Sequence, residues 1–235
     1  MGIHITRHIP NFVTCLNLFS GCIACHMAFH AEYRLAFLFI LLSALFDFLD
    51  GMLARLLKAY SPVGKDLDSL ADDVSFGAAP SFLAFSLLTE ADYPPFLENT
   101  QNILPYAGFL ICVFSALRLA KFNNDSRQAS SFIGLPVPAN ALFWGSLATS
   151  AYGLSIHGYL NAIYLLLLIL AFSYLLVAEI PMFSLKFKNL KWNDNKIRFL
   201  FLVVCIPLLA FLKLSGFAAI IIWYILLSVL TAKKG

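Results

Sequence analysis

Two pairs of aspartates lie in the stretch Asp47-Phe-Leu-Asp50-Gly-Met-Leu-Ala-Arg55 and in the stretch that follows it after eight residues, Gly64-Lys-Asp-Leu-Asp68-Ser-Leu-Ala-Asp72. Both pieces lie within or beside strongly apolar sequence. A carboxylate that faces lipid costs at least about 2.5–3.5 kcal/mol, so four aspartates here require a reason. The usual reasons are metal binding, proton transfer or binding of a charged substrate.

The composition predicts a membrane protein. The chain has 235 residues, of which 60% are hydrophobic and 12% charged, whereas soluble domains carry about 25% charged residues. We therefore predict an all-α, polytopic helical membrane protein that forms one domain over residues 1–235, with its signature motif at 47–72. Nucleic-acid binding is excluded because no basic face interleaved with aromatic residues is present.

Eight apolar segments have about the 20-residue length that crosses the hydrocarbon. They are residues 12–30, 34–57, 68–88, 103–121, 137–156, 159–180, 197–213 and 215–232. The last two are short, and a re-entrant pair is the alternative interpretation.

The cations predict the orientation. With eight spans, one side holds Arg7, Lys58, Lys65, Arg118, Lys121, Arg127, Lys186, Lys188, Lys191, Lys196, Arg198, Lys233 and Lys234. The other side holds Glu90, Asp92, Glu98 and His157, with only Arg34 and Lys213 as cations. Because cytoplasmic loops are enriched in lysine and arginine, both termini and the aspartate stretch are expected on the cytoplasmic side.

Helical spacing places the carboxylates on shared faces. One face holds Asp47, Asp50 and Ala54, and the next helix aligns Gly64, Asp68 and Asp72. We expect Pro62 and Gly64 to break the helical structure between the two helices. Four carboxylates directed into one cavity suit hard divalent cations, and two such ions form a clamp for displacement at phosphorus.

Small residues and one cation complete this pattern. Gly51, Ala54 and Gly64 leave room for a ligand to approach the backbone. Arg55 adds a cation suited to phosphate. Together with metal ions, these residues indicate a pocket for a diphosphate.

The pattern D-G-x-x-A-R, eight residues, G-x-x-x-D-x-x-x-D resembles the signature of the CDP-alcohol phosphatidyltransferase family. The matching positions are Asp50, Gly51, Ala54, Arg55, Gly64, Asp68 and Asp72, with Asp47 as an additional upstream aspartate. The resemblance implies an integral membrane enzyme that replaces CMP on a CDP-linked lipid or alcohol with a second alcohol. It also implies Mg²⁺ or Mn²⁺ as cofactor, and a homodimer is common in the family.

The same resemblance implies roles for individual residues. Two ions would be held by Asp47, Asp50, Asp68 and Asp72. Asp68 and Asp72 would be catalytic, with Asp72 as the general base. The CDP site would comprise Asn11, Thr14, Gly51, Ala54, Arg55 and Gly64, where Asn11 and Thr14 belong to a polar i, i+3, i+6 pattern that ends at Asn17. Helix–helix packing is the alternative for that pattern.

Two later segments bear on the acceptor alcohol. They are Arg118-Leu-Ala-Lys121-Phe-Asn123 and Phe132-Ile-Gly134-Leu-Pro136-Val-Pro138-Ala-Asn140. They resemble the bacterial and archaeal phosphatidylserine-forming members of the family, although Lys121 stands where arginine is usual. Serine brings a carboxylate, which Arg118, Lys121 and Arg127 are expected to bind. Positive-inside topology is the alternative reason for these cations.

We therefore predict transfer of the phosphatidyl group from CDP-diacylglycerol to L-serine, in a bacterial cytoplasmic membrane with the site facing the cytoplasm. One alternative is the same chemistry with glycerol 3-phosphate or an inositol phosphate as acceptor. Another is a cation- or proton-coupled transporter, since carboxylates within the membrane also mark that class.

Overall fold

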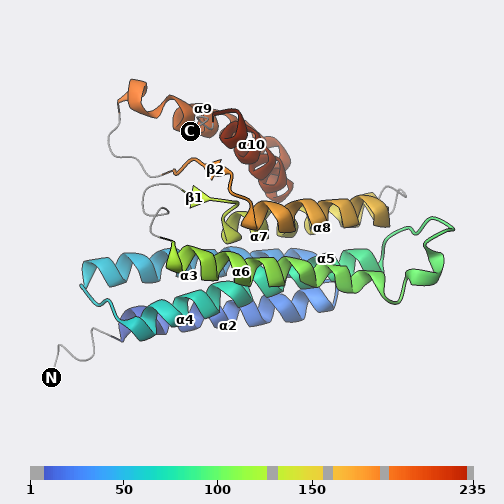
Figure 1. Ribbon diagram of the computed structural model, residues 1–235, viewed down its shortest axis with the longest axis horizontal. Helices are drawn as coiled ribbons and strands as arrows, with labels where there is room; N and C mark the ends of the chain where they lie inside the picture. Colours follow the sequence, from blue (N-terminus) through green and yellow to red (C-terminus); the bar gives the residue numbers. More distant parts are fainter. Residues whose placement is uncertain (1–7, 126–131, 156–160, 186–190, 232–235) are drawn as a thin grey trace.

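The computed structural model describes residues 8–125, 132–155, 161–185 and 191–231, and helices make up most of it (Figure 1). In chain order they are α2 (Ile9–Phe29), α3 (Tyr33–Leu56), α4 (Pro62–Asp72), α5 (Ala79–Thr89), α6 (Leu110–Asn124), α7 (Val137–Ser155), α8 (Ala162–Val177), α9 (Trp192–Leu212) and α10 (Gly216–Thr231). Short 3₁₀ segments cover Glu98–Thr100, Leu104–Phe109 and Lys213–Ser215. The strands β1 (Phe132–Ile133) and β2 (Pro181–Met182) pair antiparallel.

Every predicted apolar segment overlaps one of these helices. The all-α class is confirmed, and several of the helices are apolar enough for a membrane. Within the described ranges, four helical stretches are long and apolar enough to cross a membrane: Ile9–Phe29, Tyr33–Leu56, Leu104–Asn124 and Trp192–Thr231. The last is a 40-residue stretch that contains both α9 and α10. The number of crossings and the orientation of the termini therefore stay predictions.

The break inside the aspartate stretch lies earlier than expected. Helix α3 ends at Leu56 and α4 already begins at Pro62. The Ser61 hydroxyl caps α4 by accepting the backbone N–H of Gly64 at 3.0 Å. Proline fits the first helical turn because its fixed φ suits a helix and no N–H is needed there. The predicted helix break is therefore confirmed, and Pro62 marks its end as the first residue of α4, but the prediction is wrong for Gly64, which lies within α4.

Helix α4 continues into α5 through a π-helical turn, Asp73–Ala78. This turn directly follows Asp72, the last aspartate of the motif. Pro80 in the first turn of α5 cannot donate a backbone hydrogen bond to the preceding turn, which gives a local reason for the altered pairing. Such π-turns inside helices occur frequently at functional sites.

Helix α2 packs closely against α4 and the π-helical turn because the residues on its inner face are small. Its buried residues are Pro10, Thr14, Asn17, Ser20, Gly21, Ala24 and Ala28. Small residues let helix backbones approach in a membrane, where lipid removes the hydrophobic drive for association. A Cβ at Gly21 would lie 2.8 Å from the Cα of Ser75. The contact therefore sets α2 beside the turn that follows Asp72.

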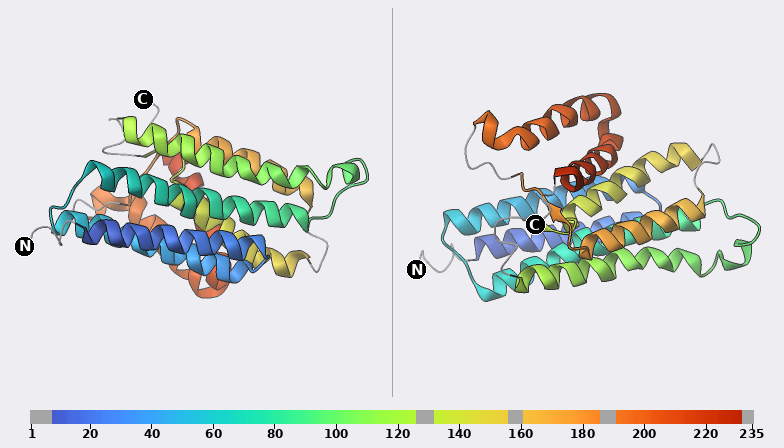
Figure 2. Two further views of the ribbon diagram at one scale, coloured as in Figure 1. Left: turned by 90° about the horizontal axis from the view of Figure 1, so that it is seen from below. Right: turned by 45° about the horizontal axis from the view of Figure 1, so that its top comes forward.

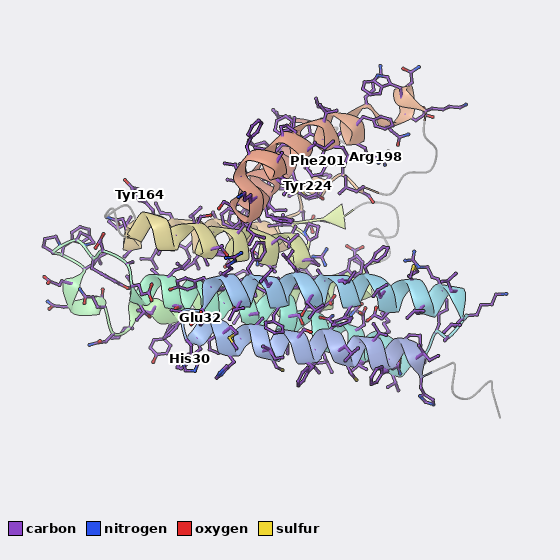
Figure 3. All side chains as sticks on the ribbon, turned by 180° about the vertical axis from the view of Figure 1, so that it is seen from behind. His30, Glu32, Tyr164, Arg198, Phe201 and Tyr224 are labelled. Atoms are coloured by element: carbon purple, nitrogen blue, oxygen red, sulfur yellow. The ribbon has the colours of Figure 1, made fainter. Side chains whose placement is uncertain are left out.

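The C-terminal helices α9 and α10 form a hairpin that stands apart from the main layer of helices (Figures 1 and 2). The Ser146 hydroxyl donates to the carbonyl of Leu214 at 2.8 Å and accepts the N–H of Ala218 at 2.9 Å, which ties the hairpin to α7. Figure 3 labels Phe201 on α9 and Tyr224 on α10. The ring centroids of these two residues lie 6.0 Å apart.

Candidate active site

Three of the four aspartates that the spacing predicts to share one cavity meet, and they come from two helices. Asp47 and Asp50 lie on α3 and Asp68 lies on α4. One carboxylate oxygen from each lies within 4.8 Å of the other two. Asp50 is only 6% exposed, and its Oδ2 is buried without a hydrogen-bond partner among the described residues. A buried anionic oxygen among other carboxylates needs a cation to offset the repulsion, and oxygen donors are what Mg²⁺ and Mn²⁺ prefer. The donor set fits a divalent metal ion.

Asp72 lies one helical turn beyond Asp68, at the last position of α4. It is not one of the three carboxylates that meet within 4.8 Å. It nevertheless lies near enough to interact electrostatically with both Asp47 and Asp68. The Nδ2 of Asn17 on α2 donates to Oδ1 of Asp72 at 3.2 Å. Asp72 is therefore held from a third helix.

A cavity of about 460 Å³ opens beside these carboxylates. Its lining includes all the residues predicted for the CDP site, namely Asn11, Thr14, Gly51, Ala54, Arg55 and Gly64, together with Asp50 and Asp68. A Cβ built on Gly51 would meet nothing within 4 Å. The glycine therefore opens onto empty space.

Thr14 and Arg55 border the cavity from different helices. The Thr14 hydroxyl donates to the carbonyl of Pro10 at 3.1 Å and lies next to the Asp50 carboxylate. The Nε of Arg55 donates to the carbonyl of Gly51 at 2.9 Å. This bond anchors the guanidinium to its own helix while the side chain stays exposed, so the cation is available at the cavity edge.

The cavity also contains residues to which the motif assigns no role. They are Pro10, Ala59, Tyr60, Ser61 and Lys65. Tyr60 and Ser61 belong to the connection between α3 and α4. Because only eight residues separate the two halves of the motif, this connection has to pass close to the site, and that spacing is the signal that could have indicated them. Lys65 adds a second cation near Arg55.

Two of the predicted acceptor residues line a different cavity from the one beside the aspartates. Arg118 on α6 is 6% exposed and, with Lys121, lines a second cavity of about 270 Å³. The other charged residues of that lining are Asp125 and Glu179. The Arg118 guanidinium interacts electrostatically with Asp72 and stacks over the Phe122 ring at 5.0 Å from its centroid. Arg127, the third predicted residue, lies outside the described residues.

Side-chain hydrogen bonds join α4 to the end of α6, between the two cavities. The Nζ of Lys65 donates to the carbonyl of Asn123 at 3.3 Å. The Nδ2 of Asn123 donates to the Ser69 hydroxyl at 2.7 Å. These bonds fix the helix that carries Arg118 relative to the helix that carries Asp68 and Asp72.

The chain also matches known proteins in sequence. The family model for CDP-alcohol phosphatidyltransferase matches residues 7–231. The CDP-diacylglycerol–serine O-phosphatidyltransferase of Bacillus subtilis (strain 168) is 38% identical over 136 residues, which cover 56% of this chain and 70% of that protein. The enzyme of the same name from Methanocaldococcus jannaschii is 36% identical over 134 residues, 57% of each chain.

The enzyme of that name from Saccharomyces cerevisiae is 37% identical over 147 residues, which cover 56% of this chain and 50% of the yeast protein. The chain thus spans between half and 70% of the length of these relatives. The family model covers nearly the whole of it, including the aspartate motif and both cavities. The chain therefore belongs to the CDP-alcohol phosphatidyltransferase family.

Proposed function

We propose that this protein transfers the phosphatidyl group of CDP-diacylglycerol to L-serine, forming phosphatidylserine and CMP. The observation that carries the proposal is the meeting of Asp47, Asp50 and Asp68 beside a cavity lined by the residues of the family motif. The names of the relatives from Bacillus subtilis and Methanocaldococcus jannaschii support serine as the acceptor.

The four motif aspartates, Asp47, Asp50, Asp68 and Asp72, would hold two divalent ions, Mg²⁺ or Mn²⁺. When bound, such ions neutralise a diphosphate and stabilise a departing phosphate ester. Gly51 and Ala54 leave space for the nucleotide, with Asn11, Thr14 and Gly64 on the remaining walls. Arg55 and Lys65 supply fixed positive charge for the diphosphate.

Asp72 is the residue assigned to proton transfer, and Asp68 supports it one turn earlier. A hydroxyl is a weak nucleophile until a base accepts its proton. The serine oxygen forms a bond to the phosphorus of the phosphatidyl group. The bond from that phosphorus to the CMP oxygen breaks, and the hydroxyl proton passes to Asp72.

The second cavity suits an amino-acid acceptor. Arg118 and Lys121, joined by Arg127 from the sequence, would bind the serine carboxylate. Asp125 and Glu179 give the same cavity negative charge, which complements an ammonium group and disfavours the extra charge of glycerol 3-phosphate or an inositol phosphate. The electrostatic interaction of Arg118 with Asp72 supports placing the acceptor beside the proposed base.

The membrane arrangement is proposed from charge. In Figure 1 the start of α2 and the link between α3 and α4 lie at one end of the bundle, and residues 90–103 lie at the other. The first end carries Lys58 and Lys65, and the second carries Glu90 and Glu98. This supports the proposal that both termini and the site lie on the cytoplasmic side. Eight spans, one domain over residues 1–235, a bacterial cytoplasmic membrane and a homodimer complete the proposal as expectations from the sequence and the family resemblance.

Purified protein in liposomes with CDP-diacylglycerol and labelled L-serine tests this proposal. We expect CMP and labelled phosphatidylserine in equal amounts, loss of both with a chelator, and recovery with Mg²⁺ or Mn²⁺. CMP formation with glycerol 3-phosphate but not serine would contradict the choice of acceptor. Metal-dependent ion uptake without CMP formation would instead support the transporter alternative.

The acceptor assignment predicts a selective effect of Arg118→Lys. Lysine keeps the charge but loses the planar fork that binds a carboxylate through two hydrogen bonds. A hydrogen bond to a charged group contributes about 1.5–3 kcal/mol, so the KM for serine should rise about 10- to 100-fold. The KM for CDP-diacylglycerol should stay unchanged.

Arg198→Lys is the matched control, because Arg198 on α9 bonds the Ser184 carbonyl at 2.8 Å and lines neither cavity. It should leave both KM values unchanged. An equal rise of the two KM values in Arg118→Lys would contradict the assignment.

A further inference from the structure

Asn17 is a fully buried polar residue in the middle of α2, 0% exposed. Its backbone carbonyl accepts hydrogen bonds from the hydroxyls of Ser43 on α3, at 3.2 Å, and Ser75 in the π-turn, at 3.1 Å. Three segments therefore meet at its main chain. These two bonds anchor α2 through the Asn17 backbone alone, and the Asn17 side chain takes no part in them.

The Asn17 side chain makes a separate contact. Its Nδ2 donates to Oδ1 of Asp72 at 3.2 Å, while its own Oδ1 is buried with no hydrogen-bond partner among the described residues. Leaving a buried carbonyl oxygen unpaired is unfavourable. A side chain serving only packing would be as well served by an apolar residue, so the amide is explained by what it does to Asp72.

The amide is suited to orient a carboxylate. It donates a proton it does not release, and it brings no charge into a group that already contains Asp47, Asp50 and Asp68. A donor on one carboxylate oxygen limits rotation of the group. Asp72 ends α4 just before the π-turn, so a contact from a neighbouring helix is well placed to set its direction.

We propose that Asn17 is a positioning residue that orients the Asp72 carboxylate for accepting the proton of the acceptor alcohol. The proposal rests on the proposed function, because it assigns Asp72 the role of base. Asn17 then acts on turnover and not on binding of either substrate. It contributes through Asp72 and does not touch the reacting atoms.

Two substitutions separate orientation from packing. Asn17→Asp keeps the size and shape of the side chain but replaces the donor with a carboxylate that repels Asp72. Asn17→Ala removes both the donor and the volume. A displacement of a catalytic group by about 1 Å costs roughly 100-fold, so we expect kcat to fall about 100-fold in Asn17→Asp and at least about tenfold in Asn17→Ala.

Serine and CDP-diacylglycerol KM values are expected to stay within about twofold of wild type in both variants, since a loss confined to kcat marks an interaction made in the transition state. Each variant is assayed at saturating Mg²⁺, determined for that variant. Ser43→Ala and Ser75→Ala are the controls, because they remove only the bonds to the Asn17 backbone. They should lower the melting temperature and leave kcat near wild type.

A packing role predicts that kcat falls only in step with the melting temperature in both Asn17→Asp and Asn17→Ala, and this would overturn the proposal. Failure of Asn17→Asp, Asn17→Ala and Asn17→Ser all to fold would also overturn it. Wild-type protein is measured alongside, and absence of phosphatidylserine formation there would refute the proposed function itself.

Discussion

Asp72→Asn is expected to abolish turnover while the fold is retained. A positioned general base contributes about 10²–10⁴-fold to rate, and kcat should fall by that range. The asparagine keeps the shape of the side chain, and its Oδ1 can still accept the hydrogen bond from Asn17. Removing one of several neighbouring negative charges should leave the melting temperature of the metal-free protein equal to or above wild type.

Asp66→Asn is the matched control for this result. Asp66 lies on the same helix but is exposed, and it is not one of the motif aspartates. The substitution should leave kcat and both KM values unchanged. Phosphatidylserine formation by Asp72→Asn at the wild-type rate would remove Asp72 from the mechanism.

The second large effect is expected from Gly51→Ala, which should stabilise the protein and inactivate it. Glycine inside a helix is less stable than alanine by about 0.5–1 kcal/mol, and a Cβ at this position meets no protein atom within 4 Å. If the nucleotide occupies that space, the methyl group displaces it. Since displacements of about 1 Å cost roughly 100-fold, kcat/KM for CDP-diacylglycerol should fall by at least that factor while the melting temperature rises.

Gly21→Ala provides the contrast. Its Cβ would lie 2.8 Å from the Cα of Ser75, so the methyl group has to separate α2 from the π-turn. This variant should have a lower melting temperature than wild type, and its activity should fall as a consequence of that destabilisation. Full activity of Gly51→Ala with raised stability would show that the cavity beside Gly51 is not the nucleotide site.

Part of the site followed from local sequence, because periodicity within one helix is a short-range property. Asp47 and Asp50 are three positions apart on α3, and the shared face predicted for them is the one that meets Asp68. The cavity lining likewise contains the glycine, alanine and arginine of the motif. The break predicted at Pro62 and Gly64 ends at Pro62, because the Ser61 cap and the proline start α4 there, and this places Gly64 within the helix.

Other contacts join residues far apart in the chain. Asn17 and Asp72 are 55 positions apart, and Lys65 and Asn123 are 58 apart. Nothing in the spacing of either pair indicates that they meet. The polar pattern that ends at Asn17 was compatible with packing or with binding, and only the crossing of α2 over the π-turn directs it to Asp72.

The sequence by itself determined that the chain forms apolar helices and that its aspartates share helix faces, because hydropathy and a 3.6-residue repeat act within each segment. The tertiary structure alone decided which faces meet, where the cavities open, and that Arg118 and Asn17 approach Asp72 from different helices. In lipid, association depends on close packing of small residues and on interhelical hydrogen bonds. Those interactions depend on two helices together, so they cannot be predicted from the sequence of either helix alone.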